Sequence, residues 1–211
     1  MSKPHMIPRA VAYRWLAQFF LCPPNLTTLE SYHSVEGQQF LTGLQLYPAL
    51  APLAGWLKDA TADADAIEDL QVKIASAFTG AFDMGGPRAT LPYASVYLSE
   101  NGLLFQQPTR DMIVLLNEMQ MQPLDGMNEP PDHLVVQLHV AAELIEREEQ
   151  GQHVPISSAA FLDQQVLTWL PEFTQRCAPL SGDNPIRIFA NAAQALVQDT
   201  VNPADLCRES V

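Results

Sequence analysis

Apolar residues recur every three or four positions along most of the chain, a spacing that places them on one face of an α-helix. The pattern runs from residue 8 to 21 and again from 63 to 84, where Gly-Gly-Pro ends it. Further helices are predicted over 109–121, 131–149, 157–177 (kinked at Pro171) and 184–200, with shorter ones starting at Thr27 or Thr28 and within 48–58. The predicted fold class is therefore all-α, packed like a helical bundle.

Two stretches depart from the helical period. Residues 88–108 are rich in β-branched and aromatic residues but have no partner strand, so we predict an ordered loop laid across the helices. Residues 122–131 combine prolines with other turn-forming residues and are predicted to be a Pro-rich hinge. This hinge would separate an N-terminal helical domain, 1–121, from a C-terminal one, 132–211. We expect both a monomer and a homodimer, the latter able to exchange domains through the hinge.

Charge narrows the classes of partner. The chain has 24 acidic and 11 basic residues and a net charge of −13, which argues against nucleic acid and anionic membrane surfaces as partners. A basic ligand is favoured instead. The longest uncharged run, residues 37–57, contains three glutamines and two prolines and is too polar to cross a membrane. No export segment is apparent, so a soluble cytoplasmic protein is expected.

The sequence gives little indication of metal or redox chemistry. The three cysteines, Cys22, Cys177 and Cys207, are widely spaced and fit neither a disulfide framework nor a zinc or iron–sulfur ligand set. Reduced thiols are expected. The histidines do not follow a metal-ligand spacing either, so no metal site is predicted.

The densest group of functional side chains is Asn-Glu-Pro-Pro-Asp-His-Leu at 128–134. Pro131 suits the first position of a helix, which would place Glu129 and Asp132 beside the positive end of the helix dipole. Two interpretations remain open. The sequence is either simply a well-formed helix start, or a negatively charged hinge that presents Asp132 and His133 to a basic ligand.

The segment 91–97 carries a serine and two tyrosines, Tyr93 and Tyr97, which could line an apolar groove while their hydroxyls stay hydrated. Ser95 lacks the Gly-x-Ser-x-Gly context of a nucleophile, and Gly85-Gly86 lacks the Lys-Ser/Thr of a phosphate loop. No catalytic residues are assigned, and the chain is not expected to be an enzyme.

Together, Leu-Pro-Tyr-Ala-Ser-Val-Tyr at 91–97 and Glu-Pro-Pro-Asp-His at 129–133 resemble the TorD/DmsD family of redox-enzyme maturation chaperones. The stretches 13–20 and 169–177 are similar to a first and a late helix of its TorD branch. Two positions depart from the family pattern: Ala94 stands where many relatives carry Glu or Gly, and Ala77 where a carboxylate is common.

The resemblance implies an all-helical cytoplasmic chaperone of a molybdoenzyme, with trimethylamine N-oxide reductase as the client. Such chaperones bind the client's twin-arginine leader and its immature core until the molybdenum cofactor is inserted. The residues that carry over as leader- or client-binding are Glu129, Pro130, Asp132, His133, Pro92, Tyr93, Ser95 and Tyr97. The family is also linked to weak guanine-nucleotide binding. Since this chain has no phosphate loop, no stably bound cofactor is expected.

Two other functions stay open at this point. Asp132 and His133 could form the acid–base pair of a small helical enzyme. Alternatively, the chain could be a generic acidic adaptor that binds amphipathic helices without preference for a client.

Overall fold

The computed structural model describes residues 5–83, 90–121, 129–178 and 184–202, and within them every regular element is helical. The α-helices are α1 (Arg9–Leu21), α2 (Leu26–His33), α3 (Val35–Leu44), α4 (Ala51–Ala60), α5 (Ile67–Phe78), α6 (Ala94–Leu98), α7 (Gln107–Glu118), α8 (Leu134–Glu149), α9 (Ser158–Phe161), α10 (Leu170–Cys177) and α11 (Pro185–Val201). A 3₁₀ turn over Ala64–Ala66 precedes α5, and π-helical turns extend α5 over Thr79–Asp83 and α9 over Leu162–Val166. The predicted all-α fold class is confirmed.

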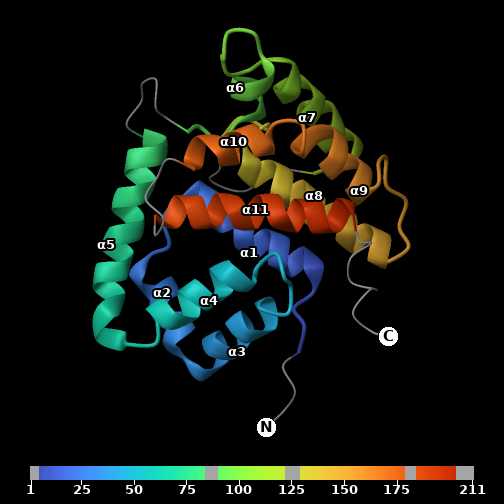
Figure 1. The fold of residues 1–211 in the computed structure, drawn as a ribbon. Helices are drawn as coiled ribbons and strands as arrows, with labels where there is room; N and C mark the ends of the chain where they lie inside the picture. The colour runs from blue at the N-terminus through green and yellow to red at the C-terminus, as the bar shows by residue number, and fades with distance from the viewer. Residues whose placement is uncertain (1–4, 84–89, 122–128, 179–183, 203–211) are drawn as a thin grey trace.

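Helix α1 lies in the middle of the molecule because its sequence is apolar around most of its circumference (Figure 1). It packs lengthwise against α8, and α11 crosses both α4 and α5. Buried residues from the first and last helices form one continuous hydrophobic cluster. The division into domains 1–121 and 132–211 stays a prediction, and most of the expected hinge, 122–128, lies outside the described residues.

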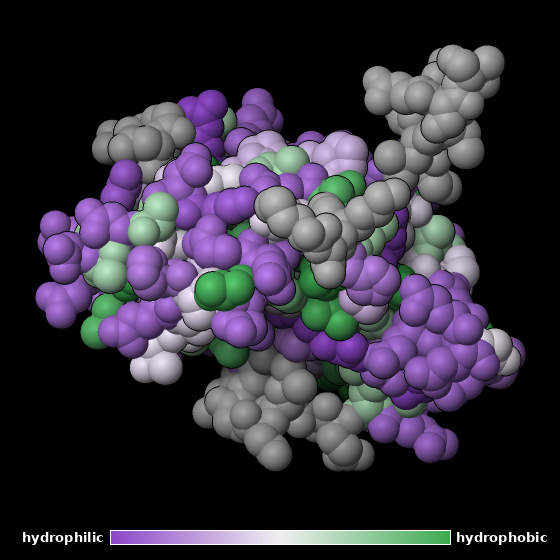
Figure 2. Space-filling view, turned by 90° about the horizontal axis from the view of Figure 1, so that it is seen from below, coloured by the Kyte–Doolittle hydropathy of each residue, from purple (hydrophilic) through white to green (hydrophobic). Residues whose placement is uncertain are grey.

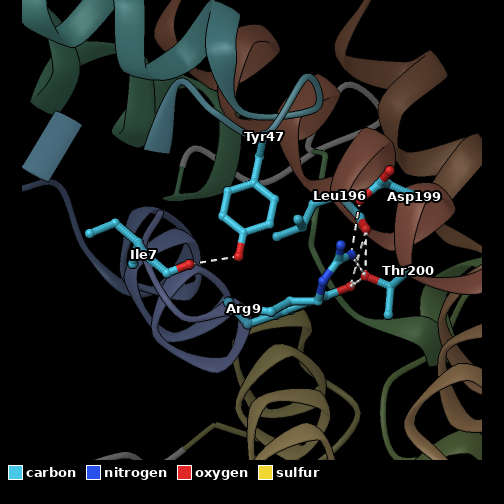
Figure 3. Close-up of polar contacts among 7 residues, drawn as sticks. Ile7, Arg9, Tyr47, Leu196, Asp199 and Thr200 are labelled. Carbon is cyan, nitrogen blue, oxygen red and sulfur yellow. Dashed lines mark hydrogen bonds and ion pairs between the residues drawn. The ribbon is translucent and has the colours of Figure 1, made fainter. Parts of the chain in front are cut away.

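Polar contacts join the beginning of α1 to the end of α11 (Figure 3). The Arg9 guanidinium donates hydrogen bonds to Asp199 Oδ2 at 2.9 Å and to Thr200 Oγ1 at 2.8 Å. The buried Tyr13 hydroxyl lies 2.8 Å from Thr200 Oγ1 and 3.2 Å from the Leu196 carbonyl oxygen. Burial raises the pKa of Tyr13, so the hydroxyl stays protonated and can donate.

Several local predictions were wrong. Residues 94–98 form α6 rather than loop, and α3 lies in a stretch for which no helix was predicted. Asn25, not Thr27 or Thr28, caps α2 by accepting a hydrogen bond from the Thr28 amide. The helix expected over 157–177 is interrupted before α10, so Pro171 lies in the first turn of a new helix, where its missing N–H costs nothing, instead of kinking a continuous one.

The face seen in Figure 2 is covered mostly by hydrophilic residues, with hydrophobic ones scattered among them. Among the described residues, no helix is long and apolar enough to cross a lipid bilayer.

We predict that Tyr13→Phe lowers the free energy of unfolding by about 1 kcal/mol, because a buried hydroxyl loses its contacts with α11 while Thr200 keeps other partners. Urea denaturation at constant m would measure the change. Tyr47→Phe is the matched control. The Tyr47 hydroxyl donates to the Ile7 carbonyl oxygen rather than to α11. The Tyr47→Phe variant should therefore keep every contact between α1 and α11 that Tyr13→Phe removes. An unchanged midpoint in Tyr13→Phe would show that this contact contributes nothing.

Candidate functional site

The site is built around a turn that precedes α8. The Pro130 carbonyl oxygen accepts a hydrogen bond from the His133 amide at 2.9 Å, which closes a four-residue turn with Pro131 at its second position. Proline is favoured there because its fixed φ suits the turn. Helix α8 then begins at Leu134, with His133 as its N-cap. The expectation that Pro131 is the first helical residue was therefore wrong.

This turn and the start of α6 satisfy each other's backbone donors. The Ala94 amide donates to the Asp132 carbonyl oxygen at 3.1 Å, and the Leu134 amide donates to the Pro92 carbonyl oxygen at 2.8 Å. Both amides belong to first helical turns and so have no partner within their own helices. The exchange fixes two segments about 40 residues apart in the sequence side by side.

The Asp132 carboxylate lies at the centre of this junction and is 0% exposed. Its Oδ2 accepts a hydrogen bond from the Ser95 amide at 2.8 Å, and its Oδ1 accepts one from the Thr109 hydroxyl of α7 at 2.7 Å. Ser95 Oγ lies 3.2 Å from Thr109 Oγ1 and accepts a hydrogen bond from the Gln106 amide at 3.2 Å. Through Asp132, the starts of α6, α7 and α8 are joined at one point.

His133 is also buried, at 4% exposed, and its Nδ1 accepts a hydrogen bond from the Val135 amide at 3.1 Å. The ring proton is therefore on Nε2. Burial lowers the pKa of His133 to about 4, although the nearby Glu129 and Asp132 carboxylates act in the opposite direction. A neutral ring is the form that this cap requires.

Tyr93 and Glu129 form the partly exposed edge of the site. The Tyr93 hydroxyl donates a short hydrogen bond to Glu129 Oε2, and its ring lies edge-on to His133 with the centroids 4.6 Å apart. Burial, reinforced by Glu129, raises the pKa of Tyr93, so the hydroxyl remains a donor. A cation approaching from solvent would meet Glu129 first.

Tyr97 faces a different part of the molecule. Its ring stacks on Trp169 at 5.4 Å between centroids, and the Arg176 guanidinium lies over it at 4.5 Å. Its hydroxyl is buried without a hydrogen-bond partner among the described residues, contrary to the expectation of a hydrated one. The structure thus brings together Pro92, Tyr93, Ser95, Glu129, Pro130, Asp132 and His133, but not Tyr97.

The geometry does not support an acid–base pair. The Asp132 oxygens accept from Ser95 and Thr109, and His133 Nδ1 accepts from the backbone, so no hydrogen bond through which a proton could pass joins the two side chains. Within the described ranges, no cluster of three or more His, Cys, Asp or Glu side chains is arranged to hold a metal ion.

Comparison of the sequence with known proteins identifies the family of the chain. A family model described as the nitrate reductase delta subunit matches residues 45–175, which include the whole junction. The chain is 36% identical to chaperone protein TorD of Vibrio vulnificus (strain YJ016) over 176 residues, which cover 81% of this chain and 82% of that protein. It is 34% identical to chaperone protein TorD of Vibrio parahaemolyticus over 195 residues, covering 90% and 89% of the two chains.

The chain belongs to the TorD family. The resemblance drawn from 91–97 and 129–133 is therefore confirmed. These TorD relatives are named as chaperones, a role that is not enzymatic, in agreement with the prediction that the chain is not an enzyme.

Sequence reasoning missed Thr109 and Gln106, which complete the junction in this TorD-family protein. Neither lies in the two recognisable motifs. Their one local signal is the proline at 108, which marks the first turn of α7 but does not reveal what that turn contacts.

We predict that Asp132→Ala lowers the free energy of unfolding by about 3 kcal/mol, because a carboxylate acceptor of two buried hydrogen bonds is lost. Asp132→Asn should cost only about 1 kcal/mol, since an amide can still accept from Ser95 and donate to Thr109. Asp111→Ala, at an exposed position of α7, is the control and should change stability by less than about 0.5 kcal/mol. Equal effects of all three variants in urea denaturation would contradict this assignment.

Stability should also fall on acidification. The pKa of His133 is lowered in the folded state, so its contribution is complete above about pH 6.5 and is lost as the pH falls toward 4. The loss amounts to about 3 kcal/mol over that window. The His133→Asn variant keeps a side-chain acceptor at the cap but loses the titratable imidazole, so the stability of this variant should depend less on pH than that of the unmodified chain. His139, whose pKa burial also lowers, accounts for part of what remains. The exposed His153→Asn is the control, and an identical pH profile for both variants would rule out His133 as the source.

Proposed function

We propose that the protein is a cytoplasmic chaperone that binds the twin-arginine leader and immature core of a molybdoenzyme, assisting insertion of the molybdenum cofactor before export. Trimethylamine N-oxide reductase is the proposed client. The kinship with TorD chaperones supports the general role. The observation that carries the leader-binding proposal is the fixed placement of Glu129 and Tyr93 at the edge of the junction.

Charge supports a basic ligand at this edge. The protein carries a net charge of −13, and the partly exposed Glu129 carboxylate, held at Oε2 by the Tyr93 hydroxyl, is the kind of group that a guanidinium binds. Asp132 lies too deep to touch a ligand in this conformation, so its role is to position the turn. His133 likewise supports the turn from within.

Charge alone does not supply the affinity. An exposed Arg–carboxylate pair contributes about 0.2–1 kcal/mol. Burial of about 400 Å² of apolar surface would contribute on the order of 10 kcal/mol before the costs of association and ordering are subtracted. We therefore expect a complex of roughly micromolar affinity, in which charge sets selectivity and the apolar stretch supplies most of the binding free energy.

The test is calorimetric titration of the full chain with a trimethylamine N-oxide reductase leader peptide, beside the same peptide with both arginines changed to glutamine. Glu129→Gln should reduce the affinity for the arginine peptide roughly threefold or more and leave that for the glutamine peptide unchanged. Asp132→Ala and His133→Ala should weaken leader binding with helix content preserved. Equal binding of both peptides to the unmodified chain would contradict arginine recognition.

A competition experiment separates this proposal from a generic adaptor. Leaders of unrelated exported enzymes should displace the cognate peptide poorly from a dedicated chaperone, and as well as the peptide itself from an unselective one. Weak binding of a guanine nucleotide is also implied by the resemblance, and repeating the titration with the nucleotide present would test whether it changes the affinity for the leader.

A further inference from the structure

The hairpin formed by α6, α7 and the loop between them projects at one end of the molecule (Figure 1). Of the twelve exposed large hydrophobic side chains in the described part of the chain, five lie in this hairpin. They are Leu98, Leu103, Phe105, Ile113 and Val114. Such clustering on one exposed element is typical of an interaction surface rather than of scattered surface residues.

Three of these residues, Leu98, Leu103 and Phe105, make up what we call the hairpin tip. Hydrogen bonds between Ser99 Oγ and the backbone of Leu103, at 3.1 and 3.4 Å, close the loop and bring Leu103 back toward the end of α6. Gly102, with φ of 62°, permits the reversal.

Phe105 is the most unusual residue of the tip. It is 65% exposed, yet its backbone has φ of 60°, in the left-handed region that is unfavourable for a bulky side chain. The next residue holds this conformation in place: the Gln106 amide donates to Ser95 Oγ, and the Gln106 side chain donates to the Leu104 carbonyl oxygen at 2.8 Å. Glycine or asparagine would make this turn at lower cost. An exposed phenylalanine at a strained position therefore points to a use for its side chain.

The charge of the hairpin favours one kind of occupant. Residues 94–121 contain three acidic side chains, Glu100, Asp111 and Glu118, against one basic one. That basic residue, Arg110, donates its hydrogen bonds to the neutral Gln107. An apolar tip with an acidic surround complements an apolar segment that carries basic residues.

The hairpin tip begins only a few residues along the chain from Tyr93, which forms the edge of the site together with Glu129. Tyr93 directly precedes α6 and Leu98 is the fifth and last residue of this helix, so the two are five positions apart, or roughly 7 Å along the helix. The apolar stretch of a leader is about 7–15 residues long and spans on the order of 10–20 Å as a helix. One ligand can therefore reach both places.

We propose that the hairpin tip is the subsite for the apolar stretch of the leader whose arginines lie at Glu129. This inference rests on the proposed leader-binding function and assigns a surface to the part of the ligand that supplies most of its affinity. None of the tip residues belongs to the two motifs by which the family resemblance was found.

The test uses Phe105→Asn in the full chain, titrated with the leader peptide and with a second peptide in which serines replace the apolar stretch and the arginines are kept. We expect Phe105→Asn to weaken binding of the first peptide roughly tenfold and to leave the weaker binding of the second unchanged. Because asparagine tolerates a left-handed backbone, the melting temperature should stay the same or rise, which separates lost contact from lost folding.

Val72→Ser is the matched control, since Val72 is also largely exposed but lies on α5. Wild-type affinity in Phe105→Asn, with weakened binding in Glu129→Gln, would overturn the subsite and keep the proposed function. An equal loss in Val72→Ser would overturn it as well. Failure of the unmodified chain to bind the leader at all would remove the proposed function and this inference with it.

Discussion

The candidate site depends on one buried carboxylate, Asp132, which has no cationic partner among the described residues. Removing Asp132 from water costs several kcal/mol. Two hydrogen bonds to an ionised acceptor return about 1.5–3 kcal/mol each, and the positive ends of the neighbouring helices add to this. These terms roughly cancel. What Asp132 contributes is therefore mainly geometry, because its carboxylate, at the start of α8, accepts hydrogen bonds from donors at the starts of α6 and α7.

This arrangement divides the motif residues by depth. Asp132, His133 and Ser95 are buried and set the position of the turn, whereas Glu129, Pro130 and Tyr93 reach the surface. The residues by which the motif is most easily recognised are thus not all residues that a ligand can touch. A substitution at Asp132 would change the proposed binding through the turn and the hairpin, so a loss of binding there would not by itself locate a contact.

The all-α class followed from helical periodicity, because the long helices bury continuous apolar stripes. Short helices were harder to predict: α6 spans five residues, too few to establish a period, and the Ser95 amide in its first turn is satisfied by Asp132, 37 positions away. The predicted start of α8 was also wrong. Pro131 is a favourable local signal for a helix start, but the helix begins after His133, which is its N-cap. Thr109 could not be found from the sequence because nothing local reveals that α7 meets the turn.

The junction also bears on how the hairpin could bind. A flexible apolar loop loses conformational freedom when it binds, and that loss reduces the affinity. Here Ser95 and Gln106 connect the base of the hairpin to the Asp132 junction, and the same Gln106 holds Phe105 in its left-handed conformation. The strain at Phe105 is thus met in the free protein by interactions that exist before any ligand arrives. An apolar tip and a carboxylate that are both ordered by the same junction would join the two halves of the proposed leader recognition in a single structural unit.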